Sequence, residues 1–172
     1  MNLREAILKE HSKRQTMKIV RWVGDDKKRF SEMIRLFLKG EDLVRQRMGW
    51  TLSYAAEEHP GLVKPYLKKL LENLKRKDLH DAEKRNTVRL LQNIDLPGRL
   101  QGLATDVLFP LVISAKEPVA VKCFAMTALA RICKEHSDLA RELKLVLEEQ
   151  FPFATAGFKA RAKRTFKELK LD

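Results

Sequence analysis

At 172 residues with 44% hydrophobic side chains, the chain has the length of one domain and enough apolar surface to bury a continuous core, which excludes a disordered polypeptide. Lysine and arginine number 35 against 23 acidic residues, and the resulting net charge of +12 attracts polyanions. No run of about 18 uncharged apolar residues occurs and no signal peptide is visible, so we expect a cytoplasmic protein without a membrane-spanning segment.

The apolar periodicity predicts helices along the whole chain, because no stretch alternates apolar and polar residues as a strand does. Glycine and proline fall between the periodic segments, where they start or end helices. Pro65 lies near the first turn of its predicted helix, where proline is tolerated, and Pro110 is expected to bend its helix. The predicted helices span about residues 2–10, 13–23, 27–39, 41–58, 61–77, 81–95, 98–114, 118–135, 137–150 and 156–170.

Four of these helices repeat one pattern, in which a basic residue is followed by small or apolar residues at positions +3, +6, +7 and +10. The basic residues are Arg45, Lys84, Lys122 and Lys159, at spacings of 39, 38 and 37 residues. The pattern also occurs at Lys13, 32 residues before Arg45, so the first hairpin is expected to be a shortened cap. A period of this size is typical of stacked helical hairpins, and it predicts a single all-α repeat domain over residues 1–172.

Four strings carry a family resemblance that covers roughly residues 13–170: LVKPYLKKLLENL, AEKRNTVRLLQNI, HPGLVKPYLKKLL and VRQRMGWTL. They resemble HEAT repeats, in which the first helix often contains a proline and the second opens with Val-Arg. The resemblance implies a HEAT/armadillo-like right-handed superhelical solenoid of about five hairpins. In HEAT repeats the basic residue that opens the second helix commonly bonds to nearby carboxylates and carbonyls. Because Asp42, Asp81 and Glu117 lie close by in sequence, we interpret this basic row as mainly structural.

If positions +3, +6, +7 and +10 face the core, helix geometry places positions +1, +5 and +8 on the opposite side, which lines the concave groove of a solenoid. These fifteen positions hold seven basic side chains and no acidic one. The predicted binding residues are Arg14, Lys18, Arg21, Arg85, Arg89, Arg164 and Lys167, together with Trp50; the remaining positions are Gln46, Ser53, Gln92, Cys123, Thr127, Ala130 and Ala160.

A basic groove of this kind favours a non-enzymatic module that binds nucleic acid, DNA or RNA, through its phosphates. Trp50 either stacks on a base or sugar, or turns sideways and packs between inner helices over the gap left by Gly49. The alternative is a protein–protein scaffold that binds an acidic peptide or helix in the same groove. Salt dependence and the chemistry of the partner distinguish the two hypotheses.

A third hypothesis comes from the segment VRQRMGWTLSYAAEEHPGLV around Gly49 and Trp50. It is similar to a signature of the DNA alkylation repair glycosylases, which are HEAT-like proteins. The resemblance implies a DNA alkylation repair-like glycosylase in which Trp50 contacts the DNA backbone or the lesion. In that family the catalytic aspartate lies in a tryptophan-rich helix well upstream; here the only candidates are Asp25 and Asp26 after Trp22, in a predicted turn.

Other chemistry has no signature in this sequence. The four histidines are scattered without metal-ligand spacing, and neither a glycine-rich phosphate loop nor a Gly-x-Ser-x-Gly elbow occurs. Cys123 and Cys133 lie ten residues apart on one predicted helix, about 15 Å along its axis, which is too far for a disulfide. We therefore predict no catalytic residue, no metal ligand and no cofactor.

Overall fold

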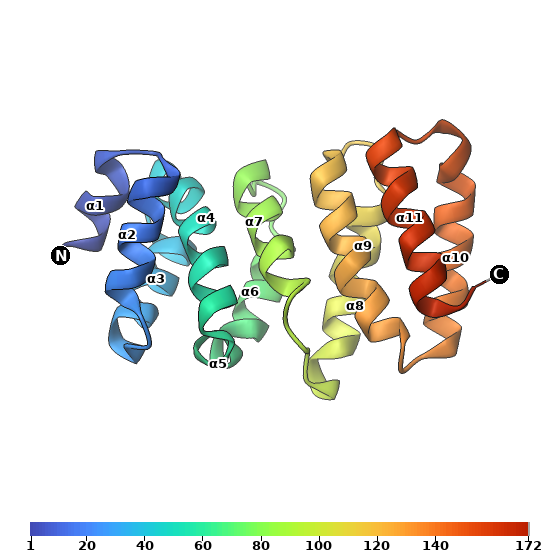
Figure 1. Ribbon diagram of the computed structural model, residues 1–172, viewed down its shortest axis with the longest axis horizontal. Coiled ribbons are helices and arrows are strands. Elements are labelled where there is room, and N and C mark those ends of the chain that lie inside the picture. The colour runs from blue at the N-terminus through green and yellow to red at the C-terminus, as the bar shows by residue number, and fades with distance from the viewer. Residues whose placement is uncertain (172) are drawn as a thin grey trace. The chain divides into compact units, whose positions relative to one another are not determined.

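The computed structural model describes residues 1–171, which are helical apart from short connections and contain no strand (Figure 1). This confirms the predicted all-α class. No helix among these residues is both long and apolar enough to cross a lipid bilayer. The helices are α1 (Leu3–Lys9), α2 (Lys13–Val23), α3 (Lys27–Lys39), α4 (Asp42–Glu58), α5 (Pro60–Val63), η1 (Lys64–Tyr66), α6 (Leu67–Asn73), α7 (Asp81–Leu91), α8 (Gly98–Ile113), α9 (Val119–Cys133), α10 (Ser137–Gln150), η2 (Phe151–Phe153) and α11 (Ala156–Leu169).

Local side-chain caps explain where several helices begin. The Ser12 hydroxyl accepts a hydrogen bond from the Gln15 N–H at 3.1 Å, so α2 starts at Lys13. Asp26 accepts from two backbone N–H groups and starts α3 in the same way. At the other end of α2, Gly24 adopts a φ of +50°, which side chains disfavour and which lets the chain turn sharply into α3.

The helix predicted over residues 61–77 is wrong as one continuous element. Pro65 lies in a 3-10 turn that separates α5 from α6, because proline has no N–H to donate and its ring crowds the preceding turn. The helix predicted to end at residue 95 ends at Leu91, where the chain enters a turn in which the Ile94 N–H donates to the Leu91 carbonyl at 3.2 Å. Pro110 lies inside α8, which continues to Ile113.

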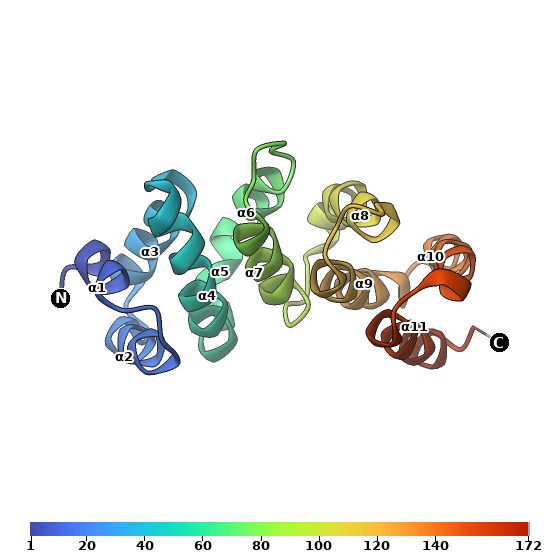
Figure 2. The same ribbon diagram turned by 90° about the horizontal axis from the view of Figure 1, so that it is seen from above.

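Two compact units divide the chain, Met1–Leu90 and Leu91–Asp172. In the first unit α4 packs against α1, α2 and α3. Its helices form two layers, with α2, α4 and α7 in one layer and α3 and α6 in the other (Figure 2). In the second unit α9 packs against α8, α10 and α11, with α9 and α11 in one layer and α8 and α10 in the other. The single domain over residues 1–172 stays a prediction.

The core of each unit follows the sequence repeat. After Lys13, Arg45, Lys84 and Lys122, every residue at positions +3, +6, +7 and +10 is buried. After Lys159 the first two positions are buried and the last two, Phe166 and Leu169, are half-buried. The predicted inward face of the repeat helices is therefore confirmed in four of the five rows and for half of the fifth.

The basic residues that open these helices bond to neighbouring groups, as expected for a structural row. Arg45 Nε donates to the fully buried Glu83 at 3.1 Å, and its NH1 donates to the Gly40 carbonyl at 3.0 Å. Lys122 Nζ donates to Gln150 Oε1 at 2.5 Å. Lys13 differs from the others, because its ammonium lies over an aromatic ring on another helix.

Candidate functional site

Two cations and three rings from different elements meet in the unit Met1–Leu90. Lys13 Nζ lies 3.6 Å from the centroid of the Tyr54 ring, and the Arg89 guanidinium carbon lies 4.4 Å from the same centroid. The Trp50 ring centroid lies 6.1 Å from that of Tyr54 and 5.5 Å from that of His11. These five residues, His11, Lys13, Trp50, Tyr54 and Arg89, are called the basic–aromatic cluster below.

The position of Lys13 and His11 depends on the joint between α1 and α2. The Ser12 cap makes Lys13 the first residue of α2, and His11 occupies the connection just before it. Gln15, buried one turn later, donates from Nε2 to the Ala6 carbonyl at 2.7 Å and so ties α2 to α1. A buried amide that bonds a backbone carbonyl is costly to displace, which keeps this joint in one conformation.

Three contacts hold α4, which carries Trp50 and Tyr54. Arg47 NH1 donates to the Leu8 carbonyl at 2.9 Å and joins α4 to the end of α1. The Arg45–Glu83 pair joins α4 to α7. Gly49 allows close packing, because a Cβ there would lie 3.1 Å from Cε2 of Phe37 and 3.3 Å from Cβ of Asn86. The gap beside Gly49 is thus filled by Phe37 and Asn86 and not by Trp50.

The electrostatics of the cluster are dominated by its two cations. Hydrogen bonds from Lys13 and then Arg89, together with their positive charges, lower the pKa of Tyr54 to about 8. Neither cation forms an ion pair with any carboxylate in residues 1–171. At neutral pH the phenol is largely uncharged, so both positive charges are available to an anion.

The sequence left two alternatives for Trp50: a ring that stacks on a base or sugar, or a ring that packs between inner helices. Trp50 is half-buried, so neither alternative describes it fully. Its ring packs beside His11 and Tyr54 at the surface of the unit and is not enclosed between inner helices. Trp50 remains partly accessible, and its ring lies beside Tyr54, which Lys13 and Arg89 contact. An accessible ring near cations can stack a base while the cations bind a phosphate.

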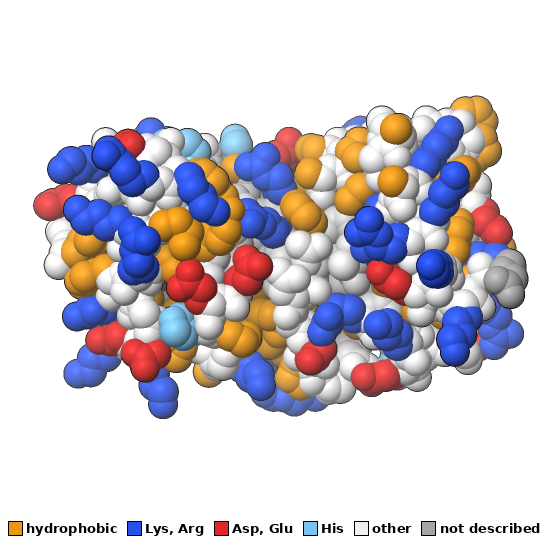
Figure 3. Space-filling view, in the orientation of Figure 1, with side chains coloured by type: hydrophobic (Ala, Val, Ile, Leu, Met, Phe, Trp, Pro, Cys, Tyr) orange, Lys and Arg blue, Asp and Glu red, His pale blue; other side chains and the backbone are white. Residues whose placement is uncertain are grey.

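The predicted basic residues are placed as follows. Lys18, Arg21 and Arg85 are exposed, and Arg14 is exposed but pairs with Glu10 at 3.2 Å. Arg89 is half-buried against Tyr54, so the expectation that it is freely exposed is wrong. Figure 3 shows Lys and Arg side chains over α2 and near α4 and α7, with hydrophobic groups among them. In the other unit α11 carries two further predicted residues, both exposed: Arg164 and Lys167.

Two of the fifteen positions predicted to line the groove are buried, so the prediction is wrong for them. Ser53 and Ala130, both at position +8, are buried at 4% and 1% exposure. At 100° per residue, position +8 lies only about 100° from +7, on the edge of the core face, so a small side chain there is covered by the neighbouring helix. The Ser53 hydroxyl accordingly donates to the Trp50 carbonyl at 2.8 Å and makes no outward contact.

Lys13, His11 and Tyr54 belong to the site but lie outside the set of binding residues that the sequence predicts. Lys13 belongs to the basic row that we interpreted as structural. Tyr54 falls at position +9, and the positions predicted to line the groove are +1, +5 and +8. A usable signal is present in the spacing of Trp50 and Tyr54, because residues four apart on a helix lie on the same face. Nothing in the local sequence relates His11 to these two rings.

The candidate catalytic segment around Trp22 has a capping role. Asp26 Oδ1 accepts from the N–H groups of Lys28 at 2.8 Å and Arg29 at 3.1 Å, and these bonds lower the pKa of Asp26. The Arg29 guanidinium lies 4.2 Å from the centroid of the Trp22 ring and donates to the Trp22 carbonyl at 2.6 Å. Across residues 1–171, no three His, Cys, Asp or Glu side chains are grouped as metal ligands.

Comparison with known proteins identifies one family. The family described as a HEAT repeat domain matches residues 3–169, which is nearly the whole chain. No curated protein and no solved structure matches the chain significantly.

Proposed function

Because this chain belongs to the HEAT repeat domain family, whose members generally act as binding scaffolds, we propose that it is a non-enzymatic module that binds nucleic acid through phosphates at the basic–aromatic cluster. The observation that carries the proposal is the pair of cations on Tyr54, which form no ion pair within residues 1–171 and lie beside a partly accessible indole.

The two kinds of group in the cluster suit the two parts of a nucleotide. Lys13 and Arg89 supply the charge-assisted hydrogen bonds that a phosphate accepts, and arginine offers a planar fork for two of its oxygens. Trp50 supplies an aromatic face for a base, and stacking of this kind tolerates any sequence. Binding is therefore expected to be weakly selective and strongly dependent on salt.

The charge around the cluster extends the contact to neighbouring phosphates. Lys18 and Arg21 continue along α2, and Arg85 lies one turn before Arg89 on α7. All three are exposed and form no ion pair with a described residue, so their charges are not already neutralised by this chain. A strand that lies across α2, α4 and α7 would meet positive side chains on α2 and α7, with Trp50 and Tyr54 of α4 between them.

Fluorescence anisotropy with labelled single-stranded DNA, RNA and duplex DNA at several salt concentrations tests the proposal. We expect the double variant Lys13→Ala/Arg89→Ala to weaken binding of all sequences alike and to reduce the salt slope by about 1 for each phosphate that the variant no longer binds. The control is the double variant Arg141→Ala/Lys144→Ala in the other unit, which removes the same charge from α10.

Equal losses in the two double variants would show that net charge alone attracts the ligand and would refute the cluster as the site. Binding of a polyglutamate peptide, with no binding of nucleic acid at low salt, would support the alternative function as a scaffold for acidic peptides.

A further inference from the structure

Three hydrogen-bond donors of the basic–aromatic cluster converge on one point. Lys13 Nζ and the Arg89 guanidinium carbon lie 3.6 Å and 4.4 Å from the centroid of the Tyr54 ring, and both side chains donate to the phenol oxygen. The Tyr54 hydroxyl keeps its own proton at neutral pH and donates it to no described residue. Two positive charges and three donor groups are therefore within reach of a single anion.

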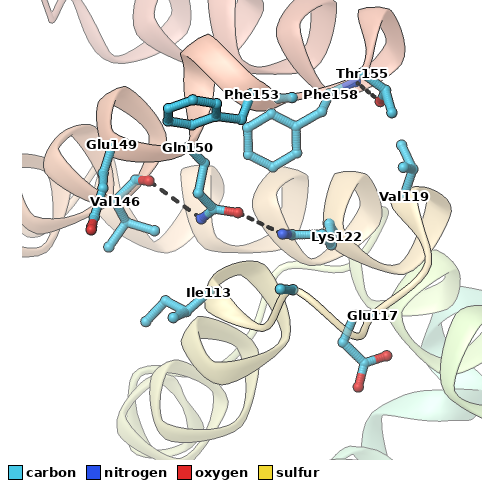
Figure 4. A pocket seen from close by; sticks show the side chains of 12 residues that line it. Ile113, Glu117, Val119, Lys122, Val146, Glu149, Gln150, Phe153, Thr155 and Phe158 are labelled. Atoms are coloured by element: carbon cyan, nitrogen blue, oxygen red, sulfur yellow. Dashed lines mark hydrogen bonds between the residues drawn. The ribbon is translucent and has the colours of Figure 1, made fainter.

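Cations near rings in the unit Leu91–Asp172 lack this arrangement. Lys122 lines the pocket of Figure 4, where its ammonium already donates to Gln150 Oε1 at 2.5 Å. Lys159 and Lys163 lie 5.7 Å and 6.0 Å from the centroid of the Phe151 ring, which has no hydroxyl group. The described part of that unit therefore offers no ring on which two cations and a hydroxyl meet.

The charges and donors of the cluster match a phosphate at the end of a strand better than a phosphate within it. A terminal phosphate is a monoester, with three free oxygens and a charge of about −1.5 to −2 at pH 7. A phosphate within a strand is a diester, with two free oxygens and a single charge. Lys13, Arg89 and the Tyr54 hydroxyl can each donate to a separate oxygen of the monoester, whose charge balances the two cations.

The side chains along α4 indicate on which side of Tyr54 the strand ends. Trp50, Tyr54 and Glu58 are four residues apart, so they lie on one face of the helix at successive turns. Glu57 and Glu58 are exposed and form no ion pair with a described residue, and no basic residue follows Tyr54 on α4. The helix dipole adds negative charge at this end. A strand that continues past Tyr54 along α4 is therefore repelled.

In the opposite direction, α7 offers a cation for the second phosphate. The colours of Figure 1 show α4 and α7 running in the same direction. Arg85, one turn before Arg89, therefore lies in the same direction from Arg89 as Trp50 lies from Tyr54. Arg85 is exposed and forms no ion pair with a described residue. A strand that leaves past Trp50 thus meets a ring for its terminal base and a cation for its next phosphate.

We propose that the basic–aromatic cluster binds the phosphorylated end of a single nucleic-acid strand. The terminal phosphate lies between Lys13 and Arg89, and the unpaired terminal base stacks on Trp50 while the strand leaves toward Arg85. This inference rests on the proposed function, because it takes the ligand to be nucleic acid, and it adds which part of the strand is recognised. A 5′ and a 3′ phosphate share the chemistry that the cluster recognises.

Fluorescence anisotropy at low salt, with labelled single-stranded DNA of one sequence, tests the proposal. The strands carry a 5′ phosphate, a 3′ phosphate or hydroxyls at both ends. Two further strands are a circle, which has no end, and a hydroxyl-ended strand one nucleotide longer, which has as many phosphates as the phosphorylated strands. We expect at least one phosphorylated strand to bind at least about fivefold more tightly than the other three kinds, because the monoester adds charge and an acceptor at the two cations. The tighter end identifies the source of the phosphate.

The ratio of the dissociation constants of the hydroxyl-ended and phosphorylated strands measures the end preference. The double variant Lys13→Ala/Arg89→Ala should bring this ratio to about 1, because both charges that face the monoester are removed. The matched control is Lys159→Ala/Lys163→Ala, which removes the same charge from beside another ring and should leave the ratio unchanged. Thermal denaturation checks that both variants are folded.

The hydroxyl of Tyr54 is tested without removing either cation. Tyr54→Phe keeps the ring and removes one donor, so it should lower the ratio by about threefold. Tyr66→Phe is the control, because the Tyr66 ring lies against Phe30 and outside the cluster, and it should leave the ratio unchanged.

The acidic end of α4 is tested by neutralising its two exposed carboxylates. Glu57→Gln/Glu58→Gln should tighten binding of the circular strand and lower the ratio, because a strand can then continue past Tyr54. The control Glu142→Gln/Glu149→Gln removes the same charge from exposed positions on α10 and should leave the ratio unchanged.

Equal affinity for the phosphorylated, hydroxyl-ended and circular strands would overturn this inference and leave the proposed function standing. No binding of any strand at low salt would overturn both. A native end preference in a folded Lys13→Ala/Arg89→Ala variant would assign the terminal phosphate to another part of the chain, and this result would also overturn the inference.

Discussion

At the scale of single residues, replacing Trp50 tests its contribution to nucleic-acid binding separately from its contribution to stability. Its half-buried ring contacts His11 and Tyr54, so Trp50→Ala is expected to lower the free energy of unfolding by about 1–2 kcal/mol. The same change should weaken binding of single-stranded nucleic acid by about 1–3 kcal/mol, because the base no longer stacks on the indole. Chemical denaturation and fluorescence anisotropy measure the two effects.

The matched control is Trp22→Ala, because Trp22 is also half-buried in this unit and lies against Arg29. It should cost similar stability and leave affinity unchanged. A loss of about 3–5 kcal/mol in Trp50→Ala with no separate effect on binding would identify Trp50 as a core residue and contradict its proposed role.

Tyr54 makes the cluster sensitive to pH. Lys13 and Arg89 lower its pKa from 10.0 to about 8, so the phenolate stabilises the fold fully above the unfolded pKa near 10, and this contribution is lost as pH falls through about 8. The phenolate also competes with an anionic ligand for the two cations. We expect nucleic-acid affinity to fall between about pH 7 and pH 9, and Tyr54→Phe to reduce that fall.

Tyrosinate absorbance checks the assignment directly, because the chain has only two tyrosines. The ring of the second, Tyr66, lies against Phe30. The titration step near pH 8 should disappear in Tyr54→Phe and persist in Tyr66→Phe. Persistence of the step in Tyr54→Phe would contradict the pKa shift at this residue.

At the scale of elements, the close approach of α4 to its neighbours determines where Trp50 and Tyr54 lie. Gly49→Ala places a Cβ at 3.1 Å from Phe37 and 3.3 Å from Asn86, so we expect a loss of about 1–3 kcal/mol in unfolding free energy. Gly102→Ala on α8 is the matched control, since a Cβ there meets nothing within 4 Å. It should stabilise the chain by about 0.5–1 kcal/mol because alanine favours the helix.

Urea denaturation of both glycine variants measures these opposite effects. If Gly49→Ala were as stable as the native chain, α4 would tolerate a wider separation from α7, and the position of the cluster would not depend on this contact.

Helix boundaries at this scale are largely predictable from the sequence. The helices at residues 13–23, 27–39 and 137–150 match the prediction because their caps and periodicity are local features. The prediction around Pro65 is wrong, because whether a proline interrupts a helix depends on how the flanking turns pack.

At the scale of the whole molecule, the contribution of the second unit to nucleic-acid binding is open to measurement. Arg164 and Lys167 are exposed on α11, in a different unit from the basic–aromatic cluster. If one strand contacts both units, the double variant Arg164→Ala/Lys167→Ala should reduce the salt slope by about 2, with the Arg141→Ala/Lys144→Ala variant as the control of equal charge. A slope unchanged from the native chain would confine binding to the first unit.

The sequence alone determined the helical class and most of the buried face of the repeat helices, since these depend on residues three to seven positions apart. The repeat itself is visible in the sequence as basic residues 37 to 39 positions apart. Six of the seven cations that it placed away from the core face are exposed, and the seventh, Arg89, is half-buried. The sequence could not place Lys13 and Arg89 on Tyr54, which lie 41 and 35 residues away along the chain. Only the packing of α2, α4 and α7 brings these side chains together, because side-chain contacts between helices depend on interhelical distance and on the bonds of Gln15, Arg45 and Arg47 that maintain it.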